Sequence, residues 1–179
     1  MIKRDEYLKK LIGFKDKQLI KVITGIRRCG KSTLLKIFSK YLLDNGIGEN
    51  QIITINFENP DYDELKDYKA LYTYLKSKLV NNNKYYILLD EIQNVTDYQK
   101  AIDGLYIMDN VDLYITGSNA YFMSGELATL LSGRYVEIQM LPLSFKEYVS
   151  AHSEKIDLPT LYRQYIENSS FPYVIELGE

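Results

Sequence analysis

Residue types that commonly mark metal sites and disulfides are scarce in this sequence. Its 179 residues include one cysteine, Cys29, one histidine, His152, and no tryptophan. A single cysteine excludes an internal disulfide, and one histidine without cysteines nearby excludes the usual zinc spacings. Any metal ion bound by this chain is therefore expected to have oxygen ligands.

Long apolar runs are absent as well. No run approaches the ~18 apolar residues that a membrane-spanning helix needs, and the N-terminal stretch "MIKRDEYLKKLIGF" is too charged for a secretory signal. We therefore expect a cytoplasmic protein with no membrane partner. With 46% apolar residues and no low-complexity tract, repeat or linker, the chain has the composition of one globular domain with a real core.

Charge is distributed unevenly along the chain. Residues 1–40 contain twelve Lys/Arg and three Asp/Glu and so carry a net charge of +9. Because the whole chain has a net charge of −2, the remaining residues carry −11. The basic part is expected to face an anion, either a nucleic-acid surface or the phosphates of a nucleotide. The 17 tyrosines could stack on bases, but their helical or strand spacing favours the core.

Apolar periodicity predicts strands that alternate with helices. This order indicates crossover connections, a parallel sheet covered on both faces, and ligands at the carboxyl ends of the strands. The expected strands are 18–25, 51–57, 85–89, 111–116 and 135–141, and the expected helices are 4–14, 32–43, 62–79, 98–107, 121–132, 144–152 and 160–168.

The stretch "GIRRCGKSTLL" lies between the first strand and the next helix. Gly25, Gly30, Lys31 and Ser32 fit G-x-x-x-x-G-K-[ST], the phosphate-binding P-loop, in the structural context that it requires. The glycines let backbone N–H groups point at the β-phosphate, the lysine reaches the β- and γ-oxygens, and the serine hydroxyl coordinates Mg²⁺. The predicted nucleotide-binding residues are Gly25, Ile26, Arg27, Arg28, Cys29, Gly30, Lys31, Ser32 and Thr33.

Three of these loop residues allow two interpretations each. Arg27 and Arg28 either contact phosphate or a partner, or are simply exposed. Cys29 is either a small filler or a thiol that the electropositive loop makes reactive by lowering its pKa.

A second motif, "YYILLDEIQ", ends an apolar strand with two carboxylates and matches the Walker B pattern. Asp90 is expected to hold Mg²⁺ through water. Glu91 is expected to polarise the attacking water, the task that separates hydrolases from binding-only sites.

Smaller signals complete the predicted site. Ser118 and Asn119, after the fourth strand, could touch the γ-phosphate or the water, and Asn56 could hold Glu91 until a partner or ligand releases it. Arg134 could act as an arginine finger. For each of these, a turn residue or a surface residue is the alternative.

Together these segments resemble the bacterial and archaeal AAA-family ATPases of the AAA-plus superfamily, in which a P-loop domain precedes a C-terminal domain of unknown function. The resemblance rests on "IKVITGIRRCGKSTLL", "YYILLDEIQ", "YITGSNA", "LSGRYVEIQMLPLSFKEY" and "FPYVIELGE".

That resemblance implies a P-loop NTPase three-layer sandwich, a five-stranded sheet in the order 5-1-4-3-2 and Mg²⁺·ATP as ligand. It also implies sensor, glutamate-switch and arginine roles for the polar positions, with the arginine entering a neighbouring subunit of a homo-oligomer. We expect a P-loop core over 1–143 and a helical extension over 144–179. Because family members continue well beyond this point, a truncated chain with a short or missing lid is expected.

Three functions follow from this site. The first is an ATP-driven switch or motor, and the others are a regulatory module with negligible turnover and a small-molecule P-loop kinase. Glu91 argues against the kinase, which must exclude water. The string "NKYY" at Asn83 lacks the aspartate of a guanine-reading motif, so ATP is preferred to GTP. The cargo, and whether nucleic acid is a partner, stay open.

Overall fold

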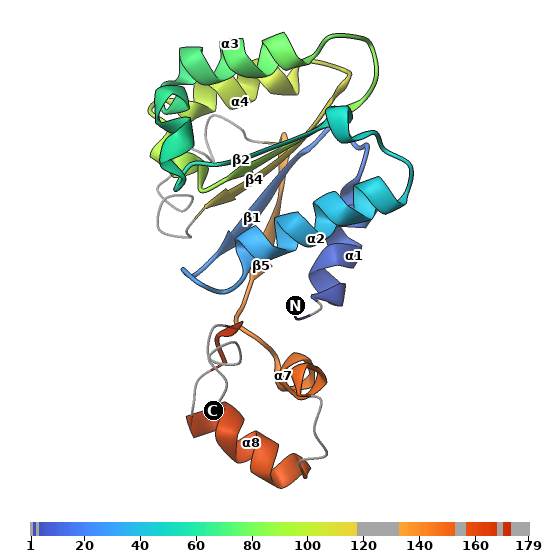
Figure 1. Ribbon diagram of the computed structural model, residues 1–179, viewed down its shortest axis with the longest axis vertical. Coiled ribbons are helices and arrows are strands. Elements are labelled where there is room, and N and C mark those ends of the chain that lie inside the picture. Colours follow the sequence, from blue (N-terminus) through green and yellow to red (C-terminus); the bar gives the residue numbers. More distant parts are fainter. Residues whose placement is uncertain (1, 3, 118–132, 153–156, 168–169, 173–179) are drawn as a thin grey trace.

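In the computed structural model a parallel sheet separates two layers of helices (Figure 1). The structure describes residues 2, 4–117, 133–152, 157–167 and 170–172. The strands are β1 (Ile20–Gly25), β2 (Ile52–Asn56), β3 (Tyr85–Asp90), β4 (Val111–Gly117) and β5 (Tyr135–Met140). The helices are α1 (Asp5–Phe14), α2 (Lys31–Asp44), α3 (Tyr68–Lys78), α4 (Tyr98–Tyr106), α7 (Phe145–Ala151) and α8 (Leu158–Glu167), with short 3-10 turns at Glu49–Gln51, Pro60–Leu65 and Ile92–Asn94.

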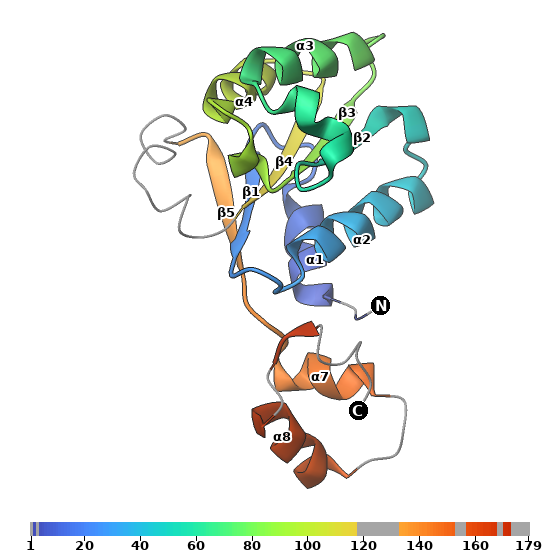
Figure 2. The same ribbon diagram turned by 60° about the vertical axis from the view of Figure 1, so that its left-hand side comes forward.

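The strand order is β2-β3-β4-β1-β5, and every pairing is parallel. Read from the opposite edge, this is the predicted order 5-1-4-3-2, so that prediction is confirmed. Helices α3 and α4 cover one face of the sheet, and α1 and α2 cover the other (Figure 2).

Two hydrophobic clusters hold the layers together, and β3 contributes to both. Ile87 and Leu89 pack under α3 and α4, whereas Tyr86 and Leu88 pack under α1 and α2. All six residues of this strand are buried, as expected for a central parallel strand covered on both faces.

The helix predicted over 62–79 is wrong at its start. Residues 60–65 form the 3-10 turn, and α3 begins only at Tyr68. The Asp67 carboxylate accepts hydrogen bonds from the N–H groups of Lys69 (2.9 Å) and Ala70 (3.3 Å). This N-cap fixes the helix start, because the residue that supplies it has extended backbone.

The C-terminal described segments pack on each other beyond the carboxyl edge of the sheet (Figure 1). Aromatic side chains join α7 to α8, with ring centroids 5.2 Å apart for Phe145 and Tyr162 and 5.3 Å apart for Tyr148 and Tyr165. The boundary between residues 143 and 144 stays a prediction, and the predicted helix 121–132 lies outside the described residues. No described helix is both long and apolar enough for a membrane span.

A buried ion pair ties β1 to β4 near the amino ends of the strands. Lys21 and Asp112 are 0% and 1% exposed, and their side chains are hydrogen-bonded to each other. The carboxylate also accepts bonds from the Tyr114 hydroxyl (2.9 Å) and the Asp16 N–H (2.9 Å). Burial lowers the pKa of Lys21, but the adjacent carboxylate opposes this shift.

Removing the cation of this pair is expected to destabilise the fold. Lys21→Met leaves a buried carboxylate without its counter-charge, which costs about 3–5 kcal/mol of unfolding free energy. Urea denaturation measures this loss, with Lys9→Met, an exposed site on α1, as the control. A loss under about 1 kcal/mol in Lys21→Met would show that the remaining donors suffice for the carboxylate.

Candidate functional site

The predicted motifs meet at the carboxyl edge of the sheet. The loop 26–30 follows β1, and Asp90 ends β3. Thr116 is the penultimate residue of β4, which lies between β1 and β3. Parallel pairing brings the ends of these three strands to the same edge, which is where open parallel sheets bind ligands.

The loop after β1 depends on its two glycines. A Cβ on Gly25 would lie 2.5 Å from the Met140 carbonyl oxygen and 2.7 Å from the Cys29 sulfur, so no larger residue fits there. Gly30 has φ +104°, a left-handed conformation, and α2 starts at the next residue. Gly30 is the N-cap of α2 and has no side chain to cap it, so the N–H groups of the first turn can bind an anion.

Lys31 points from the start of α2 back across the loop. It is buried, and its ammonium donates to the carbonyl oxygens of Gly25 (3.2 Å) and Ile26 (3.4 Å). Its nitrogen also lies 3.4 Å from Oε1 of Glu91. A buried cation is thus held between the loop backbone and the carboxylate after β3.

Hydroxyl groups surround the Asp90 carboxylate. Thr116 donates to Oδ1 of Asp90 (2.6 Å) and accepts from the Glu91 N–H (2.9 Å), and Ser32 is also hydrogen-bonded to the Asp90 carboxylate. Burial raises the pKa of Asp90 above its ordinary 3.8, although the two hydroxyls oppose the shift. One aspartate therefore links the first turn of α2 to the ends of β3 and β4.

This raised pKa predicts that Asp90 costs stability at neutral pH. The folded protein keeps the proton to a higher pH than the unfolded chain does, so the penalty is absent below pH ~3.8 and complete above the folded-state pKa. Without divalent metal at pH 7, Asp90→Asn is therefore expected to melt a few degrees higher than the wild type. Thermal unfolding measures this, with exposed Asp109→Asn as an unchanged control. A lower melting temperature for Asp90→Asn at pH 7 would refute it.

Glu91 occupies an unusual backbone conformation for its residue type. Its φ is +54°, and its side chain is 13% exposed. One carboxylate oxygen faces Lys31, and the other accepts a hydrogen bond from the Gln93 amide. Non-glycine residues with positive φ cluster at functional sites, and here the turn aims the carboxylate at the loop.

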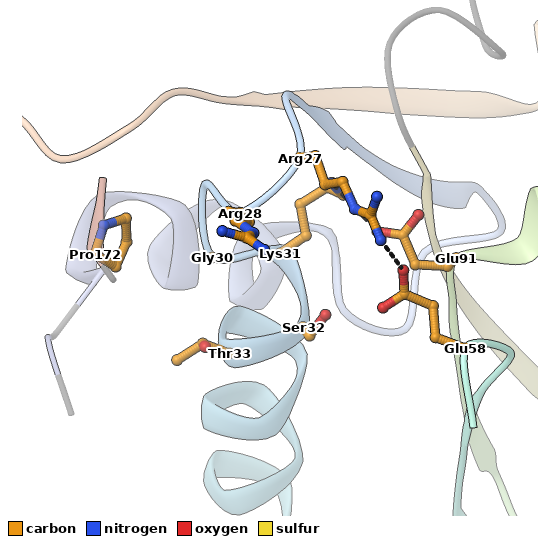
Figure 3. Close-up of a pocket in the computed structure, with 9 residues that line it drawn as sticks. All are labelled: Arg27, Arg28, Gly30, Lys31, Ser32, Thr33, Glu58, Glu91 and Pro172. Carbon is orange, nitrogen blue, oxygen red and sulfur yellow. Dashed lines mark hydrogen bonds and ion pairs between the residues drawn. The ribbon is translucent and has the colours of Figure 1, made fainter. Parts of the chain in front are cut away.

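Lys31, Ser32 and Glu91 line a cavity of about 430 Å³ beside the start of α2 (Figure 3). Arg27 crosses it, with a guanidinium nitrogen 3.3 Å from the Glu58 carboxylate. This ion pair is exposed and adds little stability. The cavity is lined by Arg27, Arg28, Gly30, Lys31, Ser32, Thr33, Glu58, Glu91 and Pro172.

Cys29 lies behind the loop in the hydrophobic cluster under α1 and α2. Its side chain is fully buried, and burial raises the pKa of the thiol. The reactive-thiol interpretation is therefore wrong, because desolvation outweighs the cations nearby. The filler interpretation agrees with its burial.

The remaining predicted site residues are Asn56, Arg134, Ser118 and Asn119. Asn56 accepts a hydrogen bond from the Glu58 N–H (2.8 Å), whereas the Glu91 carboxylate pairs with Lys31 and Gln93 in the described part of the chain. Arg134 precedes β5 at the amino ends of the strands, and its guanidinium pairs with the Asp103 carboxylate of α4. Ser118 and Asn119 lie outside the described residues.

Sequence reasoning missed Thr116, Gln93 and Glu58. A buried polar residue at the carboxyl end of the strand "VDLYIT" was the available signal for Thr116. Gln93 and Glu58 gave no such signal, because the bond of Gln93 to Glu91 and the place of Glu58 in the cavity depend on how the turns after β3 and β2 fold.

Comparison with known proteins identifies a family and a fold for this chain. A family model described as "AAA domain" matches residues 17–149. An uncharacterized protein of Haemophilus influenzae is 45% identical over the whole chain, and one of Methanocaldococcus jannaschii is 33% identical over 87% of it. The chain spans 46% and 36% of the lengths of these two relatives.

Solved structures share the fold at low sequence identity. A Walker-type ATPase of Pyrococcus abyssi is 16% identical with a TM-score of 0.64, covering 98% of this chain and 66% of that one. AMPPCP-bound DnaA of Aquifex aeolicus is 14% identical with a TM-score of 0.59, covering 96% and 57%. Aeropyrum pernix Orc1 in complex with DNA is 14% identical with a TM-score of 0.62, covering 92% and 50%. With the P-loop NTPase fold and a family match over most of its length, the chain belongs to the AAA domain family.

Proposed function

We propose that this chain binds Mg²⁺·ATP and hydrolyses it to ADP and phosphate, and that this reaction drives a switch or motor. The observation that carries the proposal is the convergence of Lys31, Ser32, Asp90 and Glu91 at one edge of the sheet. The loop with the start of α2, the end of β3 and the turn after β3 thus supply hydrogen-bond donors for phosphate, ligands for a cation and a base for water.

Phosphate binding rests on the loop backbone and Lys31. The N–H groups of the loop and the first turn of α2 are donors for the β-phosphate, and the ammonium is the counter-charge for the β- and γ-phosphates. Phosphate oxygens compete with Glu91 for this ammonium, 3.4 Å away. Triphosphate binding would therefore release the carboxylate toward the water.

The donors near Asp90 fit a hard divalent cation. A carboxylate and the Ser32 hydroxyl are the oxygen ligands that Mg²⁺ prefers alongside phosphate and water. When bound, Mg²⁺ neutralises charge on the β- and γ-phosphate oxygens. Thr116 orients the carboxylate for this task through its 2.6 Å hydrogen bond.

Hydrolysis is assigned to Glu91. Its carboxylate accepts a proton from water as the water oxygen bonds to the γ-phosphorus and the bond from that phosphorus to the bridging oxygen breaks, which leaves ADP and phosphate. Gln93 holds the carboxylate through a side-chain hydrogen bond. Ser118 and Asn119 are proposed to contact the γ-phosphate or the water, and Asn56 is proposed to hold Glu91 in an alternative position.

Substitution of Lys31 tests nucleotide binding. Lys31→Ala removes charged hydrogen bonds worth roughly 1.5–3 kcal/mol each, so ATP affinity is expected to fall at least about 100-fold. Isothermal titration calorimetry with Mg²⁺·ATP measures this loss, with Lys36→Ala, an exposed residue of the same helix, as the control. Equal ATP affinity in the two variants would exclude the P-loop as the nucleotide-binding site.

A further inference from the structure

Arg4, just before α1, reaches into the interior beside the loop after β1. Its side chain is 2% exposed. The guanidinium donates to the carbonyl oxygens of Cys29 (3.0 Å) and Leu141 (2.6 Å), and its Nε lies 2.9 Å from the Glu147 carboxylate. A single buried cation therefore joins the N-terminal segment, the loop, the end of β5 and α7.

The bond to Cys29 bears directly on the phosphate site. In a trans peptide the C=O and the following N–H point in opposite directions, and the peptide bonds of the described chain are trans. Because the Cys29 carbonyl points toward Arg4, the N–H of Gly30 in the same peptide points away from Arg4. Gly30 lines the 430 Å³ cavity, and Arg4 is not among the described residues that line it.

Glu147 provides the counter-charge for this cation. It is the third residue of α7, where its other oxygen accepts from the Ser144 N–H and hydroxyl, both at 2.9 Å. Tyr7 also contacts Arg4 and the end of β5. The Arg4 guanidinium lies 4.8 Å from the centroid of the Tyr7 ring, and the Tyr7 hydroxyl accepts a hydrogen bond from the Leu141 N–H (3.1 Å). The start of α7 is thereby linked to the loop through Arg4.

We propose that Arg4 is a positioning residue for phosphate binding, which fixes the Cys29–Gly30 peptide and makes nucleotide affinity depend on the docking of α7 through Glu147. This inference rests on the proposed function. It assigns to Arg4 an action through the loop backbone rather than a contact with the nucleotide.

The test compares ligands that share phosphates but differ in the base. Arg4→Met, Arg4→Lys and the control Arg163→Met, an exposed arginine of α8, are titrated calorimetrically with Mg²⁺·ADP and Mg²⁺·pyrophosphate. Loss of one oriented N–H to a charged oxygen is expected to weaken both ligands by the same factor, about 10- to 100-fold, in Arg4→Met. Circular dichroism at the titration temperature establishes that each variant is folded.

Glu147→Gln provides a milder variant should the Arg4 variants fail to fold. It keeps the size of the side chain and removes its charge, so we expect a smaller loss that is again equal for both ligands. In the Arg4→Met background the same change is expected to add little, because the link is already broken.

Three outcomes would overturn the inference. Folded Arg4 and Glu147 variants with unchanged affinities and lower melting temperatures would make the junction purely structural. Weaker ADP binding with unchanged pyrophosphate binding would place Arg4 against the base. Equal losses in Arg163→Met would show a non-specific charge effect. If the wild type binds neither ligand, the proposed function fails instead.

Discussion

Glu91→Gln is expected to bind ATP with near wild-type affinity and to hydrolyse it about 10²–10⁴ times more slowly. The amide keeps the shape of the side chain and its hydrogen bond with Gln93 but cannot take a proton from water. It also removes the negative charge 3.4 Å from the Lys31 ammonium, which leaves that cation free for phosphate. Binding and chemistry should therefore separate in this variant.

Single-turnover phosphate release measures the chemical step, and calorimetry measures the affinity. Glu58→Gln is the matched control, because this carboxylate lines the same cavity but pairs with Arg27. Turnover of Glu91→Gln within a factor of two of the wild type would exclude Glu91 as the base. An equally slow wild type would favour the alternative of a regulatory module with negligible turnover.

We propose that subunits hydrolyse ATP faster when they associate, and Arg134→Ala is expected to abolish this gain, a loss of about 10³–10⁵ in rate. Its carbonyl accepts from the Ile20 N–H (2.8 Å), which places it level with the start of β1. The P-loop follows the other end of that strand, about 16 Å away at ~3.3 Å per residue. Arg134 therefore lies too far to act on its own site and is proposed to act on a neighbour's.

The measurement is turnover per subunit as protein concentration rises, with association followed by sedimentation. Wild-type turnover should rise with association, whereas Arg134→Ala should keep the dilute rate. Mixing Arg134→Ala with Lys31→Ala should restore part of the activity, because one variant supplies the arginine and the other an intact site. Asp103→Asn, which removes the carboxylate 2.5 Å from Arg134, serves as a control for local structure. An equal Arg134→Ala defect in dilute and associated protein would contradict the account.

The sheet and the loop could be predicted because local signals determine them. The G-x-x-x-x-G-K-S spacing sets the glycine conformations and the helix start, and continuous apolar runs mark strands such as β3. Asp67 shows how one capping carboxylate can override the periodicity that predicted a longer helix.

Other parts of the site depend on contacts between segments far apart in the sequence. The sequence around Arg4 predicts an exposed charge, yet its side chain is buried. Its partners Cys29, Leu141 and Glu147 lie 25, 137 and 143 positions further along the chain. Thr116 likewise becomes important only when β4 lies beside β3. Both contacts arise from how segments far apart in the sequence pack together, so neither partner could be named from its local pattern.

The central claim is that this edge of the sheet recognises the β- and γ-phosphates of ATP. Calorimetric titration of the wild-type chain with ATP and with AMP, each with Mg²⁺, tests it most directly. Because Lys31 and the loop N–H groups are proposed to contact phosphates that AMP lacks, ATP is expected to bind at least about 100-fold more tightly. Equal affinities for the two nucleotides, or no measurable binding of ATP, would contradict the account.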